Sequence, residues 1–376
     1  MNYYIKKTLG LIVSAIVMFF FLVQSSAATE TFRLGVATVK TGELASYGIS
    51  ALRGVQIAVE DINDGGGILG RQIEIVTGDD LCLPKNAITV ASKLVEKDVH
   101  AVIGHICSGA TFAALDTYKN SKIIVISPSA TNPRLTKGGN YPNFYRTIAS
   151  DNTQALVQVE LAINRLKLRR IAIIHDKSVY GKGLAGYVKD ILEKTDPHKI
   201  VLFEGVSSGS INFTQFVQKI KKFKADAVIY GGYHPGASKI VKQIRVKKMR
   251  TVFISGDGIK DESFIISSGR SAEGVYATAP RDTSEIRMSR DVMQAYRNEY
   301  AEEPGPFFLN AYAAVQVLAN AFKEAGSMGY DEVSKALKSE TVQTPIGNIS
   351  FDEHGDAVGL GFSVFQVKNG AFVELK

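Results

Sequence analysis

The chain has 376 residues, of which 45% are hydrophobic and 22% are charged, and its formal net charge is +7. This length provides for two or three ordinary domains, and the composition is that of a folded globular protein. It excludes a disulfide-stapled mini-protein, a disordered chain, a collagen-like repeat and a polytopic membrane protein.

The first 28 residues have the pattern of an export signal. Lys6 and Lys7 form a positive end, residues 9–23 carry no charge, and the small residues at 25–28 suit a peptidase. Fifteen residues rise only about 22 Å as a helix, short of the roughly 30 Å of bilayer hydrocarbon. The sequence therefore predicts a cleaved signal peptide over residues 1–28, with an uncleaved anchor as the alternative. Without Lys6 and Lys7 the mature chain carries a formal charge of +5.

The chain has only two cysteines, Cys82 and Cys107, and neither lies near the leader. A lipid-modified N-terminal cysteine is therefore excluded. In an exported protein such a pair most simply forms one disulfide, which indicates an oxidising compartment; two free buried thiols are the alternative.

From Thr31 onward, apolar β-rich runs alternate with amphipathic helical stretches. In the first series we expect strands at 32–38, 73–76, 101–103 and 123–126, separated by helices near 51–63, 85–96 and 108–118. The second series has strands near 171–174, 200–203, 227–230 and 252–254, with a helix-length segment after each. Helices near 290–300 and 308–323 follow, and the chain ends in strand-like pieces near 348–351 and 361–367.

This alternation predicts an α/β protein with parallel sheets covered by helices on both faces. Two such series indicate two lobes, with a ligand crevice at the carboxyl ends of the strands. The polar stretches Thr131–Asn143 and Ala277–Ser284 end the two series and are candidate crossovers between the lobes.

Two short motifs are typical of other functions, nucleotide binding and hydrolysis, but neither lies between the helices and strands that its function requires. Gly65, Gly67 and Gly70 satisfy G-x-G-x-x-G, yet they follow a helix and precede a strand, so they predict a helix C-terminal turn instead of a nucleotide site. Gly205-x-Ser207-x-Gly209 resembles a nucleophile elbow, but a polar loop follows it where an elbow needs a helix.

A secreted serine hydrolase using Ser207 with His234, Asp257 and His354 remains a weaker alternative. The six histidines show no metal-ligand spacing, so we expect no metal site and no cofactor.

Candidate anion ligands follow two neighbouring strands of the first series. Ser108 lies where a buried strand gives way to a helix, and Ser129 and Thr131 follow the next strand. Free amides at a helix N-terminus together with hydroxyl groups can bind a carboxylate. For Ser108 considered alone, an ordinary N-cap is the commoner role, and the second strand end beside it favours the anion site.

In the second series, polar residues follow three strands and face the same crevice. Tyr180 begins a helix after one strand, Tyr233 follows the next, and Asp257 follows the third between Gly256 and Gly258. A carboxylate here can pair with a ligand ammonium, and a turn aspartate is the alternative.

At these residues the chain resembles the periplasmic leucine/isoleucine/valine-binding proteins, the substrate-binding subunits of branched-chain amino acid ABC importers. The resemblance covers nearly the whole mature chain. It is carried by residues 73–82, 102–108 and 127–133 in the first series, and by 170–177, Tyr180-Gly181 and 230–235 in the second.

The resemblance implies a type I periplasmic-binding-protein fold, with two Rossmann-like lobes joined by three crossovers. Lobe 1 would comprise residues 29–149 and 280–360, and lobe 2 residues 150–279 and 361–376. Cys82 and Cys107 match the family's disulfide. Ser108, Ser129 and Thr131 match the contacts to the ligand carboxylate.

The same resemblance assigns the rest of the site. Asp257 and Tyr233 match the ammonium contacts, and Tyr180 matches a further contact from lobe 2. The side-chain pocket would include Tyr47, Ile106, Cys107 and Phe307. Well-known members carry glutamate where this chain has Asp257, which is shorter by about 1.5 Å.

The function that the resemblance implies is a non-enzymatic, monomeric periplasmic protein that captures an aliphatic L-amino acid. It would deliver this ligand to an inner-membrane ABC permease and would bind no nucleic acid. A binding protein for an amide, urea or GABA-like ligand is the main alternative, and Asp257 discriminates, because an uncharged ligand has no need of it.

Overall fold

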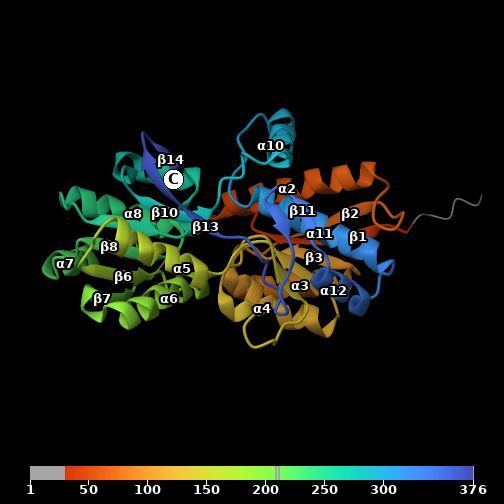
Figure 1. Ribbon diagram of the computed structural model, residues 1–376, viewed down its shortest axis with the longest axis horizontal. Coiled ribbons are helices and arrows are strands. Elements are labelled where there is room, and N and C mark those ends of the chain that lie inside the picture. Colours follow the sequence, from red (N-terminus) through yellow and green to blue (C-terminus); the bar gives the residue numbers. More distant parts are fainter. Residues whose placement is uncertain (1–29, 208–209, 211, 376) are drawn as a thin grey trace, which may run out of the picture.

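The computed structural model describes residues 30–207, 210 and 212–375, so the predicted signal peptide lies outside the described residues. The described chain forms two α/β lobes that lie side by side along the long axis of the molecule (Figure 1). Each lobe is built on one sheet, and helices flank each sheet. No described helix combines the length and the apolar content that crossing a bilayer requires.

Lobe 1 contains a parallel five-stranded sheet in the order β2-β1-β3-β4-β5. Its strands are β1 (Phe32–Thr38), β2 (Ile73–Asp79), β3 (Ala101–Gly104), β4 (Ile124–Ser127) and β5 (Phe144–Arg146). Its helices are α2 (Ala45–Asp64), α3 (Pro84–Glu96), α4 (Ser108–Asn120), α10 (Arg287–Tyr300), α11 (Phe308–Ala325) and α12 (Tyr330–Ser339). A separate hairpin joins β11 (Val342–Thr344) to β12 (Gly347–Ile349).

Both faces of this sheet are buried, which explains the continuous apolar runs of its strands. Along β1, Leu34 and Val36 belong to the core that α2 and α11 cover, whereas Ala37 belongs to the core under α3 and α4. This alternation is the two-residue period of a strand.

Lobe 2 contains a seven-stranded sheet in the order β14-β13-β10-β9-β8-β6-β7. In this sheet β13 is antiparallel to both of its neighbours, β10 and β14. Its strands are β6 (Ile171–His175), β7 (Ile200–Gly205), β8 (Ala227–Gly231), β9 (Val252–Ser255), β10 (Tyr276–Pro280), β13 (Phe362–Lys368) and β14 (Ala371–Leu375). Its helices are α5 (Asp151–Glu160), α6 (Val179–Thr195), α7 (Thr214–Lys222), α8 (His234–Val246) and α9 (Glu262–Ser268). Short 3-10 or π turns lie at Pro133–Leu135, Leu161–Arg165, Pro197–Lys199, Asp257–Ile259 and Gly269–Ala272.

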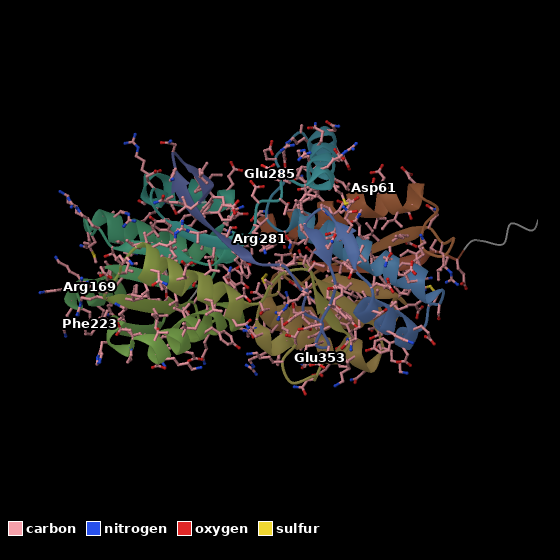
Figure 2. The ribbon with its side chains drawn as sticks, viewed as in Figure 1. Asp61, Arg169, Phe223, Arg281, Glu285 and Glu353 are labelled. Atoms are coloured by element: carbon pink, nitrogen blue, oxygen red, sulfur yellow. A yellow bond between two sulfur atoms is a disulfide. The ribbon has the colours of Figure 1, made fainter. Side chains whose placement is uncertain are left out.

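The chain passes between the two sheets three times: after β5, after β10 and after β12. Arg281, at the second passage, lies near the middle of the molecule between the lobes (Figure 2). These passages support the lobe boundaries that we propose, at 149/150, 279/280 and 360/361. The expectation that Thr131–Asn143 is a crossover is wrong, because this stretch leads to β5 in the same sheet.

Most predicted elements lie where they are expected, but α2 begins six residues earlier than the predicted start at Ala51. The added turns contain Gly48. In the structure it allows a close approach, because a Cβ at Gly48 would lie 2.0 Å from the carbonyl oxygen of Val39. The predicted turn at Gly65 is confirmed, since Gly65 caps the C-terminus of α2.

Candidate functional site

Residues from both lobes line one small cavity at the junction between them. Eight of the ten predicted ligand contacts lie in its wall, together with Gly258: Tyr47, Ile106, Ser108, Ser129, Tyr180, Tyr233, Asp257 and Phe307. The other two predicted contacts, Thr131 and Cys107, are buried nearby but do not line this cavity. The fold thus brings together side chains that are up to 260 positions apart in the sequence.

The lobe-1 wall of the cavity presents hydroxyl groups beyond the ends of β3 and β4. Ser108 is the first residue of α4 and makes no capping hydrogen bond, because Cys107 holds the N-cap position. The Ser108 hydroxyl instead accepts a hydrogen bond from the amide of Asn132 at 3.3 Å. The Ser129 hydroxyl donates to the carbonyl of Ile106 at 2.8 Å. The ordinary N-cap alternative for Ser108 is therefore wrong.

Asp257 supplies the negative charge of the lobe-2 wall. Its Oδ1 accepts hydrogen bonds from the Tyr180 hydroxyl at 2.6 Å, from Gln154 Nε2 at 3.3 Å and from the amide of Gly258 at 3.1 Å. The described residues give its Oδ2 no hydrogen bond. Burial raises the pKa of Asp257 to about 6, although the donors at Oδ1 act in the opposite direction. A cationic group at Oδ2 would hold this carboxyl ionised.

A second buried acid, Asp151, was missed by the sequence analysis. It is fully buried at the start of α5, and neither of its carboxyl oxygens has a hydrogen-bond partner among the described residues. Burial and the nearby charge of Asp257 raise its pKa to about 8, although the neighbouring Thr131 hydroxyl and the charge of Arg146 act in the opposite direction. The hydroxyl of Thr131 is likewise buried without a partner, and its carbonyl accepts the Asp151 amide at 2.9 Å.

In the sequence, Ser150-Asp151 has the pattern of an ordinary helix start, so Asp151 does not stand out as a candidate site residue. One signal in the sequence could have indicated Asp151: it comes directly after the first passage between the lobes. An acid at the start of the helix that follows this passage lies beside the crevice between the lobes.

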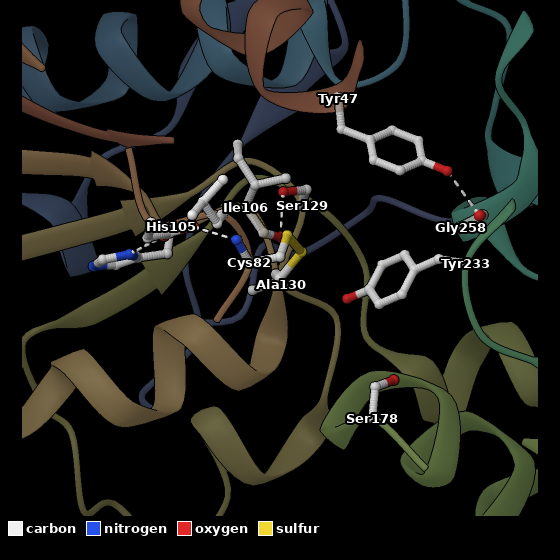
Figure 3. The surroundings of a disulfide bond; sticks show 12 residues. Tyr47, Cys82, His105, Ile106, Ser129, Ala130, Ser178, Tyr233 and Gly258 are labelled. Atoms are coloured by element: carbon white, nitrogen blue, oxygen red, sulfur yellow. Dashed lines mark hydrogen bonds and ion pairs between the residues drawn. A yellow bond between two sulfur atoms is a disulfide. The ribbon is translucent and has the colours of Figure 1, made fainter. Parts of the chain in front are cut away.

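Aromatic rings enclose the cavity between its two polar walls. The Tyr47 ring lies 5.9 Å from Phe307 and 6.4 Å from Tyr233, and Tyr233 lies 5.1 Å from Tyr180. The Tyr47 hydroxyl donates to the carbonyl of Gly258 at 2.8 Å and so joins the lobes directly (Figure 3). A second interlobe hydrogen bond runs from Asn132 Nδ2 to the carbonyl of Val179 at 2.9 Å.

The cavity is small in this arrangement of the lobes. Its volume is about 20 Å³, enough for one water molecule but not for an amino acid. A larger cavity of about 420 Å³ lies alongside, lined by Leu44 and Cys107 of lobe 1 and by Val179 of lobe 2. Tyr233 lines both spaces. A ligand therefore requires the Tyr233 ring to move or the lobes to part.

Arg146 is a positioning residue that the sequence analysis did not single out. Its fully buried guanidinium donates to the carbonyls of Ala130 and Asn132 at 3.2 and 3.1 Å, and its Nε pairs with Asp356 at 2.6 Å. These contacts fix the backbone that carries Thr131. Arg146 thus shapes the lobe-1 wall without lining the cavity.

A disulfide joins Cys82 to Cys107 and lies beside the cavity (Figure 3). This disulfide excludes the alternative of two free buried thiols. Close to it, the buried His105 ring contacts the Asp80 carboxylate through Nδ1 and the Tyr118 hydroxyl through Nε2. Because the Asp80 carboxylate also accepts the amide of Cys82 at 2.7 Å, this network holds the loop that leads to the disulfide.

The residues of the weaker hydrolase alternative do not assemble into a triad. His234 packs against Tyr47 with ring centroids 5.5 Å apart, and His354 pairs with its neighbour Glu353. Asp257 is held by Tyr180 and Gln154. No hydrogen bond joins either histidine to Asp257 among the described residues, so these candidates do not form the predicted nucleophile–base–acid chain.

Comparisons with known proteins agree with this architecture. A family model described as "Periplasmic binding protein" matches residues 31–371. A leucine-, isoleucine-, valine-, threonine- and alanine-binding protein of Pseudomonas aeruginosa is 36% identical over 91% of each chain.

Two solved structures are similar over 92% of this chain. A leucine-binding protein from Thermotoga maritima superposes with a TM-score of 0.86 at 24% identity, over 98% of its own chain. A branched-chain amino acid transporter substrate-binding protein of Streptococcus pneumoniae, in complex with isoleucine, superposes over its full length with a TM-score of 0.82 at 29% identity.

Proposed function

Because the chain belongs to the periplasmic binding protein family, with the type I fold of that family, we propose that it captures branched-chain L-amino acids between its lobes for an ABC importer. The observation that carries this proposal is the cavity at the lobe junction, which has hydroxyl groups in one wall and a carboxylate in the other. The relatives named above bind such amino acids and are binding proteins. We therefore propose no enzymatic activity.

The proposal assigns one end of the zwitterionic ligand to each lobe. The ligand carboxylate would accept hydrogen bonds from Ser108, from Ser129 or its neighbouring amides, and from Thr131. The ammonium would pair with Oδ2 of Asp257, beside Tyr233. Both charges are then compensated after water is excluded, as burial of an ion requires.

Asp151 adds a second acid close to the ammonium position. Its oxygens and the Thr131 hydroxyl make no hydrogen bond within the described protein, and Asp151 lies close enough to Asp257 for the charge of Asp257 to raise its pKa. With a pKa of about 8, Asp151 is mostly protonated near pH 7 in the ligand-free protein, and we propose that the ligand ammonium lowers this pKa so that Asp151 becomes a second counter-charge in the complex. It would also compensate for Asp257, which is one methylene shorter than the glutamate of well-known family members.

The apolar wall of the site sets the preference among side chains. Tyr47, Ile106 and Phe307 line the cavity, and Cys107 lies behind them in the disulfide. One methylene in an apolar pocket contributes only about 1 to 3 kcal/mol to discrimination. We therefore expect overlapping affinities for leucine, isoleucine and valine instead of strict selection of one.

Ligand binding would favour the closed arrangement of the lobes. The two proposed charge partners of the ligand lie on different lobes. The hydrogen bonds from Tyr47 to Gly258 and from Asn132 to Val179 also connect the lobes. A ligand that holds both walls stabilises the closed state over the open one. The permease could then distinguish a loaded from an empty protein.

The proposed setting is the periplasm, reached through cleavage of the leader at residues 1–28. The disulfide between Cys82 and Cys107 suits this oxidising compartment. The proposed partners are an inner-membrane ABC permease and the amino acid, and the proposed state in solution is a monomer.

Calorimetric titration of ligand-stripped protein tests the proposed function. We expect leucine, isoleucine and valine to bind, and we expect urea, acetamide and GABA to bind far more weakly. Tight binding of a neutral amide without binding of leucine would favour the alternative ligand class. An ester-hydrolysis assay on the same protein, with Ser207→Ala as the control variant, tests the enzymatic alternative.

A further inference from the structure

A strongly basic surface lies at the outer end of lobe 2 and has no part in the proposed function. Three loops, two of them taken with the last two residues of the preceding helix, carry it: residues 166–170 before β6, 221–226 from the end of α7 to β8, and 245–251 from the end of α8 to β9. Parallel pairing places Ile171 beside Ala227, and Ala227 beside Val252, so the three loops meet at one edge of the sheet. Figure 2 shows Arg169 and Phe223 together at the end of the molecule that is farthest from lobe 1.

Hydrogen bonds hold these three loops together as one surface. The Arg170 guanidinium donates to the carbonyl of Phe223 at 2.7 Å, and the Asp226 carboxylate accepts the amides of Arg169 and Arg170 at 2.9 and 3.0 Å. The carbonyl of Asp226 in turn accepts the amide of Val252 at 2.8 Å. The positions of the loops are therefore fixed by the backbone.

We call these three loops the basic end, after their ten cationic residues: Lys167, Arg169, Arg170, Lys221, Lys222, Lys224, Arg245, Lys247, Lys248 and Arg250. All are exposed except the half-buried Arg245. Asp226 is the only acidic residue in the three loops, and its carboxylate accepts hydrogen bonds from backbone amides. The basic end thus has a formal charge of +9 against +7 for the whole chain, which leaves −2 for everything else.

Acids in the flanking loops do little to offset this charge. Asp196, before β7, pairs with Lys199 at 3.3 Å, and Glu193 pairs with Lys189 at 2.6 Å. Glu273 precedes β10 and forms no ion pair with another described residue, so among these three acids it alone offsets one positive charge. Like charges held this close raise the electrostatic free energy of the isolated protein, and an anionic partner relieves it.

An apolar side chain stands in the middle of these cations. Val246 is 76% exposed and is flanked by Arg245, Lys247 and Lys248. The only aromatic residue in the three loops is the half-buried Phe223. Nucleic acid recognition relies on exposed aromatic rings for base stacking, whereas lysines around an exposed aliphatic side chain suit a lipid headgroup layer.

We propose that the basic end binds reversibly to an anionic phospholipid surface. This interaction would keep the protein near the membrane while the cleft between the lobes stays free, since no residue of the basic end lines that cleft. Each lysine or arginine near such a surface contributes roughly 1 kcal/mol, which corresponds to about fivefold in partitioning. The proposal does not depend on the amino acid ligand.

Vesicle sedimentation tests this proposal. The protein used begins at residue 29, because the apolar leader would itself bind lipid and every described helix and strand lies beyond it. The vesicles contain either phosphatidylcholine alone or an equal mixture with phosphatidylglycerol. The variant K221Q/K222Q/K247Q/R250Q removes four exposed charges, and K85Q/K93Q/K335Q/K338Q removes four exposed charges from lobe 1 as the matched control.

We expect binding to the anionic vesicles only, at least a 30-fold loss in the lobe-2 variant, and less than a threefold change in the control. Added salt should weaken the binding. Far-ultraviolet circular dichroism should give the same spectrum for all three proteins, which shows that each is folded. Equal loss in the two variants, equal binding to neutral vesicles, or binding to a 20-base oligonucleotide but not to vesicles would overturn the proposal.

Discussion

The replacement Asp257→Asn tests the ammonium assignment most sharply within the site. Asparagine keeps the shape of the side chain and an oxygen that can accept the Tyr180 and Gly258 hydrogen bonds to Oδ1, so we expect the variant to fold. What it removes is the negative charge at a position that is only 3% exposed. The ligand ammonium would then be buried without a counter-charge.

The size of the effect follows from this burial. Removing one partner of a buried charge pair costs about 2 to 5 kcal/mol, which is roughly a 30- to 4,000-fold loss of affinity. Titration calorimetry with L-leucine measures it. Asp190→Asn is the matched control, because Asp190 lies on α6 of the same lobe and is exposed.

A deaminated analogue separates the loss of charge pairing from general damage to the site. We expect 4-methylpentanoate, which lacks the ammonium, to bind the Asp257→Asn variant at least as well as the wild-type protein. Leucine affinity within a factor of two of wild type would refute the ammonium assignment. An equal loss for both ligands would indicate that the replacement disturbs the cavity.

Three further predictions concern pH and stability. The pKa of Asp257 is about 6 without ligand, and an adjacent ammonium lowers it, so ligand binding below pH 6 releases a proton. Leucine affinity measured by calorimetry should therefore fall by up to about tenfold for each pH unit below 6. An affinity that does not change with pH in this range would contradict this prediction. The pKa of Asp151 is raised to about 8, so the folded state holds this proton more tightly than the unfolded chain, and stability is lost as pH rises. Asp151→Asn should therefore raise the unfolding temperature of ligand-free protein more at pH 8 than at pH 5, and a gain equal at both pH values would argue against the raised pKa. Reduction of the disulfide, which spans 25 positions, should lower the free energy of unfolding by roughly 3 kcal/mol in urea titrations, and an unchanged midpoint would oppose this.

The alternation of apolar strands and amphipathic helices predicted most of the parallel strands of both sheets, because parallel strands buried on two faces read as continuous apolar runs. It did not predict β10, β14 or α12. It also failed at β5 and at the start of α2. The first has only three residues, Phe144–Arg146, and the second contains Gly48, whose role in packing against Val39 is a tertiary effect. Neither feature leaves a periodic signal.

The residues of the site were predictable to the extent that they follow strand ends. Ser108, Ser129, Tyr233 and Asp257 all do, and the structure places each in one wall of the same cavity. Asp151 was missed because its burial depends on how α5 of lobe 2 packs against the backbone at Thr131 of lobe 1. Arg146 was missed because its buried contacts, to Ala130, Asn132 and Asp356, join parts of lobe 1 that are far apart in the sequence. No local pattern in the sequence records either packing arrangement.

The central claim is that opposite ends of one zwitterion are held by opposite lobes. A crystal structure of the protein with L-leucine tests it most directly. We expect the leucine carboxylate to lie within hydrogen-bonding distance of Ser108 Oγ and the ammonium within about 3 Å of Asp257. A leucine bound in the reverse orientation, or with both ends on one lobe, would contradict it.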